Sequence, residues 1–193
     1  MPNPISRFPV PELAGLPEDI RARILAVQEK AGFVPNVFLA LAHRPDEFRA
    51  FFAYHDALML RDSSLTKAER EMIVVATSGA NRCLYCVVAH GAILRIYAKN
   101  PEIADRIALN PTRASLIRAG LTPRQAAMIG YAMKVAAAAE DIGDGDLAAL
   151  RNHGFDDEAI WDIGAIAAFF ALSNRLASMT AMQPNPEFFT MGR

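Results

Sequence analysis

The stretch EMIVVATSGANRCLYCVVAH, residues 71–90, contains both cysteines of the chain and ends on a histidine. The apolar residues that follow the cysteines predict a helix that begins at residue 81 or 82. At about 3.6 residues per turn, Cys83, Cys86 and His90 then lie on one face of this helix. The sequence therefore predicts that two thiols and one imidazole lie close together.

A thiol at the start of a helix loses its proton more readily than usual, because the free N–H groups there stabilise negative charge. A neighbouring histidine can accept the thiol proton or pair with the thiolate. A thiol with a pKa of about 8.5 is only about 3% ionised at pH 7, and a pKa of about 7 raises this fraction roughly fifteenfold. The helix start favours ionisation of Cys83, whereas His90 one turn later favours Cys86, so the residues alone leave the choice open.

The composition points to one soluble globular domain. The chain has 193 residues, of which 52% are hydrophobic and 21% charged, and its formal net charge is −1. No run of five or more basic residues occurs, so the charge pattern of a nucleic-acid-binding or membrane-surface protein is missing. The N-terminus has no apolar core of signal-peptide length, and no stretch reaches about 18 apolar residues, which predicts a cytoplasmic protein without a membrane span.

Residues 1–16 are predicted to form a proline-rich arm, and residues 17–193 a single all-helical domain. The stretches TKAE (residues 66–69) and TPRQ (residues 122–125) are capping-box signatures, so a helix is expected to start after each threonine. No segment alternates like a half-buried strand. Helices joined by short turns favour an antiparallel bundle, in which Glu71 can face the cysteine helix.

Glu71 stands twelve residues before Cys83, and a C-x-x-C-x-x-x-H pattern follows that ends at His90. This spacing resembles the core motif of the alkylhydroperoxidase D-like (AhpD-like) proteins within the carboxymuconolactone decarboxylase superfamily. The stretches GFVPNV (residues 32–37) and SNR (residues 173–175) are similar to the branch called uncharacterised peroxidase-related proteins. The resemblance implies an all-α, AhpD-like bundle of antiparallel helices that assembles into homo-oligomers, either trimers or hexamers.

The resemblance also implies that the cysteine pair itself reduces organic hydroperoxides, without another cofactor or a metal. Carried over by position, Cys86 becomes the thiolate that attacks the peroxide, Cys83 the resolving thiol, and Glu71 with His90 the proton relay. A dithiol reductant, either a lipoyl-bearing or a thioredoxin-like protein, is then expected to regenerate the thiols. Tyr85 departs from the family pattern, because alkylhydroperoxidase D has a histidine there and a tyrosine cannot act as a base near neutral pH.

Three other interpretations stay open. A zinc-binding structural module could use Cys83, Cys86 and His90, but it needs a fourth ligand. A carboxymuconolactone decarboxylase-like enzyme would move protons and would not need the cysteine pair. An oligomeric interaction protein with a vestigial site would show no thiol reactivity.

The remaining polar candidates are given structural roles. His55 and His153 are predicted to be surface histidines or core histidines with a partner. Asn174 and Arg175 are predicted to be structural rather than catalytic. The phenylalanines of residues 48–52 are predicted to belong to the core or to a subunit interface.

Overall fold

The computed structural model describes residues 5–109 and 111–193. Within this part the chain forms helices and turns and no strand, which confirms the all-α class. Residues 1–4 of the predicted arm lie outside the described residues. The helices in chain order are α1 (Glu18–Ala31), α2 (Asn36–Leu41), α3 (Pro45–Met59), α4 (Lys67–Ala80), α5 (Leu84–Ala98), α6 (Ile103–Leu109), α7 (Arg113–Arg118), α8 (Pro123–Ala137), α9 (Asp144–Asn152), α10 (Asp157–Met179) and α11 (Glu187–Thr190), with short 3-10 helices at η1 (Leu13–Gly15) and η2 (Ala139–Asp141).

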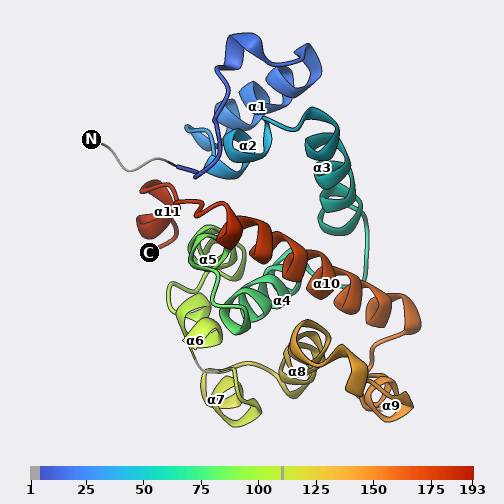
Figure 1. Ribbon diagram of the computed structural model, residues 1–193. Helices are drawn as coiled ribbons and strands as arrows, with labels where there is room; N and C mark the ends of the chain where they lie inside the picture. Colours follow the sequence, from blue (N-terminus) through green and yellow to red (C-terminus); the bar gives the residue numbers. More distant parts are fainter. Residues whose placement is uncertain (1–4, 110) are drawn as a thin grey trace.

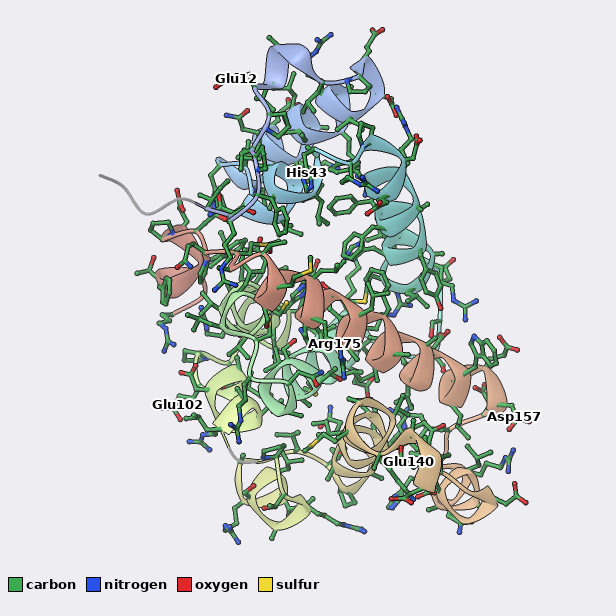
Figure 2. The ribbon with its side chains drawn as sticks, viewed as in Figure 1. Glu12, His43, Glu102, Glu140, Asp157 and Arg175 are labelled. Carbon is green, nitrogen blue, oxygen red and sulfur yellow. The ribbon has the colours of Figure 1, made fainter. Side chains whose placement is uncertain are left out.

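The long helix α10 crosses the middle of the molecule, with α1, α2 and α3 on one side and α4, α6, α7, α8 and α9 on the other (Figure 1). In the described part of the chain, α10 is the one helix long and apolar enough to cross a membrane by composition. However, 56% of its most apolar window is buried inside the protein. The apolar residues of α10 therefore pack against neighbouring helices. Charged side chains in several parts of the chain, such as Glu102, Glu140 and Asp157, are exposed (Figure 2).

Both predicted capping boxes are confirmed. At the start of α4, the Glu69 N–H donates to Thr66 Oγ1 at 3.1 Å, and the Thr66 N–H donates to Glu69 Oε2 at 3.0 Å. Thr122 and Gln125 make the same pair of bonds at the start of α8. These bonds satisfy N–H groups that have no partner inside the helix, and they fix where each helix begins.

The predicted start of the cysteine helix is wrong. The helix begins at Leu84, with Cys83 as its N-cap, rather than at residue 81 or 82. The intervening turn forces Arg82 into the left-handed region with φ of 54°, which is incompatible with a continuing right-handed helix. Cys83 therefore lies directly at the free N–H groups of α5.

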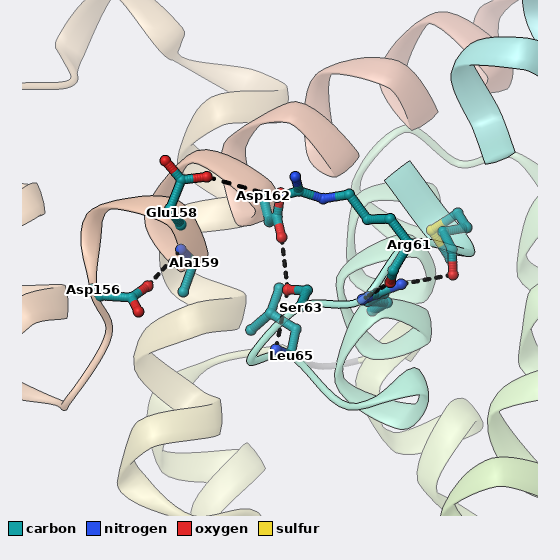
Figure 3. A network of polar contacts seen from close by, with 9 residues as sticks. Arg61, Ser63, Leu65, Asp156, Glu158, Ala159 and Asp162 are labelled. Atoms are coloured by element: carbon teal, nitrogen blue, oxygen red, sulfur yellow. Dashed lines mark hydrogen bonds and ion pairs between the residues drawn. The ribbon is translucent and has the colours of Figure 1, made fainter. Parts of the chain in front are cut away.

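The loop between α3 and α4 is fastened to α10 by a buried carboxylate (Figure 3). Asp162 is only 2% exposed, and it accepts hydrogen bonds from Arg61 Nη2 and from Ser63 Oγ, each at 2.6 Å. Arg70, on α4, donates to the carbonyl oxygens of Met59 at 2.7 Å and Arg61 at 2.6 Å. These bonds hold the start of α4 in a fixed position relative to α10.

The described part of the N-terminal arm lies along the end of α10. The Arg7 N–H donates to the Thr180 carbonyl at 2.7 Å, and the Gln183 N–H donates to the Ile5 carbonyl at 3.1 Å. Leu16 is buried in a cluster with Ile20 and Phe48, which joins the end of the arm to α1 and α3. The predicted phenylalanine stripe contributes to this core.

Helices α4 and α6 approach closely at Gly79. A Cβ atom at this position would lie 2.7 Å from the carbonyl oxygen of Ala108, closer than real Cβ atoms come to backbone oxygens. Gly130, within α8, faces open space instead. The two glycines therefore differ in what a methyl group would meet.

We predict that Gly79→Ala lowers the free energy of unfolding by about 1–3 kcal/mol, because α6 must move away from α4 to accommodate the methyl group. Gly130→Ala is the matched control and should raise it by roughly 0.5–1 kcal/mol, since alanine favours a helix interior. Equilibrium unfolding in urea measures both. Equal effects of the two substitutions would contradict the close approach.

Candidate functional site

The structure brings Glu71 of α4 and His90 of α5 into direct contact. His90 Nδ1 and Glu71 Oε2 are 2.8 Å apart. Both side chains are largely buried, with 6% exposure for Glu71 and 15% for His90. A buried carboxylate that holds one ring nitrogen fixes the orientation of the imidazole and leaves the other nitrogen free to exchange protons.

The two cysteines meet at the first turn of α5. The backbone N–H of Cys86 donates to Cys83 Sγ at 3.4 Å, so the Cys83 sulfur caps the helix. The Cys83 N–H donates to the Ser78 carbonyl at 2.9 Å, which ties the cap to the end of α4. Both thiols are free and each residue is only 2% exposed. The pair is thus buried and placed where negative charge is favoured.

The surroundings shift the pKa values of the two thiols in opposite directions. A hydrogen bond from the Cys86 thiol is the largest cause that lowers the pKa of Cys83 to about 7, and the Cys86 backbone N–H, Asn174 and His90 add to it against the opposing effect of burial. The same hydrogen bond, together with burial and the Cys83 charge, raises the pKa of Cys86 well above its usual value. Cys83 is therefore the more acidic thiol of the pair.

The site is divided into two environments. A cavity of about 170 Å³ is lined by Glu71 and His90 together with His55, Lys67 and Tyr97, among others, and neither cysteine lines it. The sulfurs instead lie in an apolar cluster formed by α2, α5, α10 and the C-terminal segment. The four predicted residues lie on two neighbouring helices, but the cavity reaches only the carboxylate and the imidazole.

Tyr85, the residue that departs from the family pattern, fastens α2 near the cysteines. Its hydroxyl accepts a hydrogen bond from the Val37 N–H at 3.1 Å, and Asn185 Oδ1 accepts one from the Asn36 N–H at 2.7 Å. These are the first N–H groups of α2, which have no partner inside the helix. Burial raises the pKa of Tyr85, so the hydroxyl stays neutral and serves as a structural acceptor rather than a base.

His55 has the partner that the sequence analysis expected for a core histidine, but its position was not foreseen. Its Nδ1 lies 3.0 Å from Asp56 Oδ1, and Asp56 in turn receives two hydrogen bonds from Arg23, at 2.8 and 2.9 Å. Burial lowers the pKa of His55, so the ring is neutral near pH 7. His55 thus faces the same cavity as Glu71 and His90, and only the packing of α3 against α10 could show this.

Among the residues that the structure describes, no group of three or more histidine, cysteine, aspartate or glutamate side chains is arranged to bind a metal ion. Nothing in this part of the chain adds the fourth ligand that the zinc interpretation requires.

Residues 45–109 match the carboxymuconolactone decarboxylase family, and this segment contains Glu71, both cysteines and His90. No curated protein matches the chain.

Solved structures match nearly the whole chain. It is 67% identical to an uncharacterized peroxidase-related protein from Ralstonia eutropha JMP134 with an alkylhydroperoxidase AhpD core, with a TM-score of 0.95 over 99% of this chain and 98% of that one. An uncharacterized peroxidase-related protein from Silicibacter sp. TM1040 is 39% identical, with a TM-score of 0.91 over 100% of this chain and 98% of that one. The debrominase Bmp8 is 16% identical, with a TM-score of 0.75 over 98% and 96%, which shows a shared fold alone. The expected AhpD-like fold is confirmed.

We predict that Tyr85→Phe makes the cysteines react faster with a neutral thiol reagent. Without the hydroxyl, the Val37 N–H loses its partner, which costs about 1–3 kcal/mol and should raise the population of states with α2 displaced roughly tenfold. The rate at which the reagent labels the cysteines in the native protein, divided by the rate in the denatured protein, measures this change in access. Tyr54→Phe is the control, since Tyr54 is 51% exposed, and its rate should equal that of the unsubstituted protein. An unchanged rate in Tyr85→Phe would mean that α2 does not limit access.

We also predict one thiolate titration step with a midpoint near pH 7, because the pKa of Cys83 is lowered to about 7. The thiolate is present above this midpoint and becomes protonated as the pH falls through it. Ultraviolet thiolate absorbance, followed from roughly pH 5 to 10, measures the step without requiring reagent access. The step should disappear in Cys83→Ser and persist, at higher pH, in Cys86→Ser. The reverse pattern would place the charge on Cys86.

Proposed function

Because this chain belongs to the AhpD-like, peroxidase-related branch of the carboxymuconolactone decarboxylase superfamily, we propose that it is a thiol-dependent peroxidase that reduces organic hydroperoxides. One observation carries the proposal: two free thiols lie together at the start of α5, where the Cys86 N–H donates to Cys83 Sγ, one helical turn from a histidine paired with a buried carboxylate. A low-pKa thiolate beside a second thiol is the arrangement that two-electron thiol oxidation requires.

The reaction begins with the attack of a thiolate on the distal oxygen of ROOH. We follow the family resemblance and assign the attack to Cys86, so its proton first moves to the Cys83 sulfur or to the Glu71–His90 pair. The S–O bond forms as the O–O bond breaks, and the leaving RO⁻ takes up a proton and departs as the alcohol. Cys86 is left as a sulfenic acid, which Cys83 attacks to form a disulfide and release water. Two thiols thus supply the two electrons that reduce the peroxide.

In this mechanism, Glu71 and His90 act as a proton relay. The imidazole Nδ1–H donates a hydrogen bond to the carboxylate of Glu71. The other ring nitrogen exchanges protons with the reacting groups. His55 lies in the same cavity as a neutral neighbour.

Turnover needs a reductant that opens the disulfide by thiol exchange. We propose a dithiol donor, either a lipoyl-bearing or a thioredoxin-like protein, and no cofactor besides the cysteine pair. A cytoplasmic location would suit two free thiols, because that compartment keeps thiols reduced. Assembly into a homo-trimer or homo-hexamer remains part of this proposal.

A proton-transfer reaction of the carboxymuconolactone decarboxylase type is the second candidate. The observation that favours it is the cavity itself, which is lined by the Glu71–His90 pair and by neither cysteine. In such a reaction the imidazole would act on a carbon acid and the thiols would be dispensable. An activity that survives replacement of both cysteines by serine would select this candidate.

We predict that Cys86→Ser abolishes the consumption of cumene hydroperoxide, because the attacking sulfur is lost. Cys83→Ser should consume about one equivalent and then stall at the sulfenic acid, since no resolving thiol remains. Peroxide consumption, thiol counts and trapping of the sulfenic acid by dimedone measure these outcomes. Comparable turnover by both variants, with the fold intact by circular dichroism, would refute the assignment.

A further inference from the structure

The cavity beside the Glu71–His90 pair has a lining with excess positive charge. Its acidic, basic and imidazole side chains are Lys67, Arg70 and Glu71 of α4, His90 of α5 and His55 of α3. With both imidazole rings neutral and the carboxyl group ionised, two positive side chains accompany one negative side chain. Protonation of a ring or of the carboxyl group would only increase this excess. The cavity is therefore suited to a negatively charged molecule.

Arg70 contributes a buried charge that has no carboxylate partner. The residue is only 4% exposed, and its Nη1 and Nη2 atoms donate to two backbone carbonyl oxygens, which are neutral. Its Nε is buried without a hydrogen-bond partner. Among the described residues no carboxylate pairs with Arg70, and the two acidic residues beside it pair elsewhere, Glu69 with Arg124 and Glu71 with His90. Since a buried charge normally has a counter-charge, an anion in the adjacent cavity would be stabilised.

Lys67 brings a second cation to the same cavity. It is an exposed residue, and its Nζ lies 5.8 Å from the centre of the Tyr97 ring, which also lines the cavity. This cation–π contact favours a position of the ammonium group near the cavity. In the part of the chain that the structure describes, Lys67 forms no ion pair, so its three N–H donors can serve an anionic ligand.

The rest of the lining is apolar, and the volume limits the size of a ligand. Met59, Leu60 and Ile93 contribute aliphatic and thioether surface beside the two cations. The volume of about 170 Å³ is below the roughly 300 Å³ at which pockets for drug-sized molecules begin. A ligand that fits both features has one anionic group and a chain of only a few carbon atoms. Small aliphatic carboxylates combine these properties.

We propose that this cavity is a binding site for a small aliphatic monocarboxylate. The carboxylate is bound by the ammonium group of Lys67 and is attracted by the uncompensated charge of Arg70. Its short chain contacts the apolar part of the lining. Neither cysteine lines the cavity, so the site is separate from the sulfurs and goes beyond the proposed peroxidase function.

The four histidines of the chain provide the measurement, because His55 and His90 line the cavity whereas His43 and His153 do not. The ring C–H signals are followed by NMR while sodium butyrate is added at constant pH. We expect the signals of His55 and His90 to shift with a Kd of about 1 mM, and those of His43 and His153 to stay in place. Sodium chloride at the same ionic strength corrects for screening.

Two further probes test the chemistry of the ligand. Butan-1-ol has a similar chain without the charge, and inorganic phosphate has charge without a chain, so each should bind at least tenfold more weakly than butyrate. Butan-1-ol that binds as well as butyrate would mean that the cavity selects the chain alone. Phosphate that binds as well would mean that it selects any anion. Either result, or unchanged signals of His55 and His90 with butyrate, would overturn the proposal.

Lys67→Gln is the variant that tests the site, and Lys30→Gln is its matched control. Lys30 is exposed on α1 and does not line the cavity. We expect Lys67→Gln to weaken butyrate binding roughly tenfold, because a charge-assisted hydrogen bond is lost, and Lys30→Gln to leave it unchanged. Equal affinities of the two variants would refute the role of Lys67. The titrations contain no peroxide, so their outcome does not depend on whether the chain is a peroxidase.

Discussion

A buried sulfur that must be able to carry negative charge is the constraint on which the rest of the site depends. A charge taken out of water is costly unless donors surround it. Here the Cys83 sulfur accepts a hydrogen bond from the backbone N–H of Cys86 at 3.4 Å. The Cys83 N–H in turn donates to the Ser78 carbonyl at the end of α4. The junction of α4 and α5 thus holds the sulfur at a helix start, where negative charge is favoured.

Helix α5 connects two parts of the site that solvent does not reach equally. Its first turn holds the sulfurs beneath α2, and its next turn holds His90 against Glu71 at the edge of a cavity. The imidazole therefore borders the cavity while the sulfurs stay buried. Under the proposed function, movement of α2 controls access to the sulfurs, and the Tyr85 hydroxyl restrains that movement. The departure of Tyr85 from the family pattern then has a structural explanation.

The sequence predicts helix starts correctly where hydrogen bonds between residues a few positions apart set them. Both capping boxes lie where their threonines predicted, because each is closed by residues three positions apart. That Glu71 could face the cysteine helix was expected from short turns between antiparallel helices, and its pairing with His90 from the family resemblance; the two side chains are 2.8 Å apart. The start of α5 was placed too early, since nothing in the local pattern revealed that Arg82 would adopt a left-handed conformation.

The sequence by itself determined the helical class, the helix boundaries set by caps, and the presence of a thiol pair one turn before a histidine. Such features arise from residues within a few positions of one another, where hydrogen bonds and periodicity act directly. Only the tertiary structure decided that α2 covers the sulfurs, that Asn174 is hydrogen-bonded to Ser78 and Asn81 at the end of α4, and that His55 shares a cavity with Glu71. The bond from Asn36 to Asn185 joins residues 149 positions apart, and contacts at that separation depend on the packing of the whole chain rather than on any local pattern.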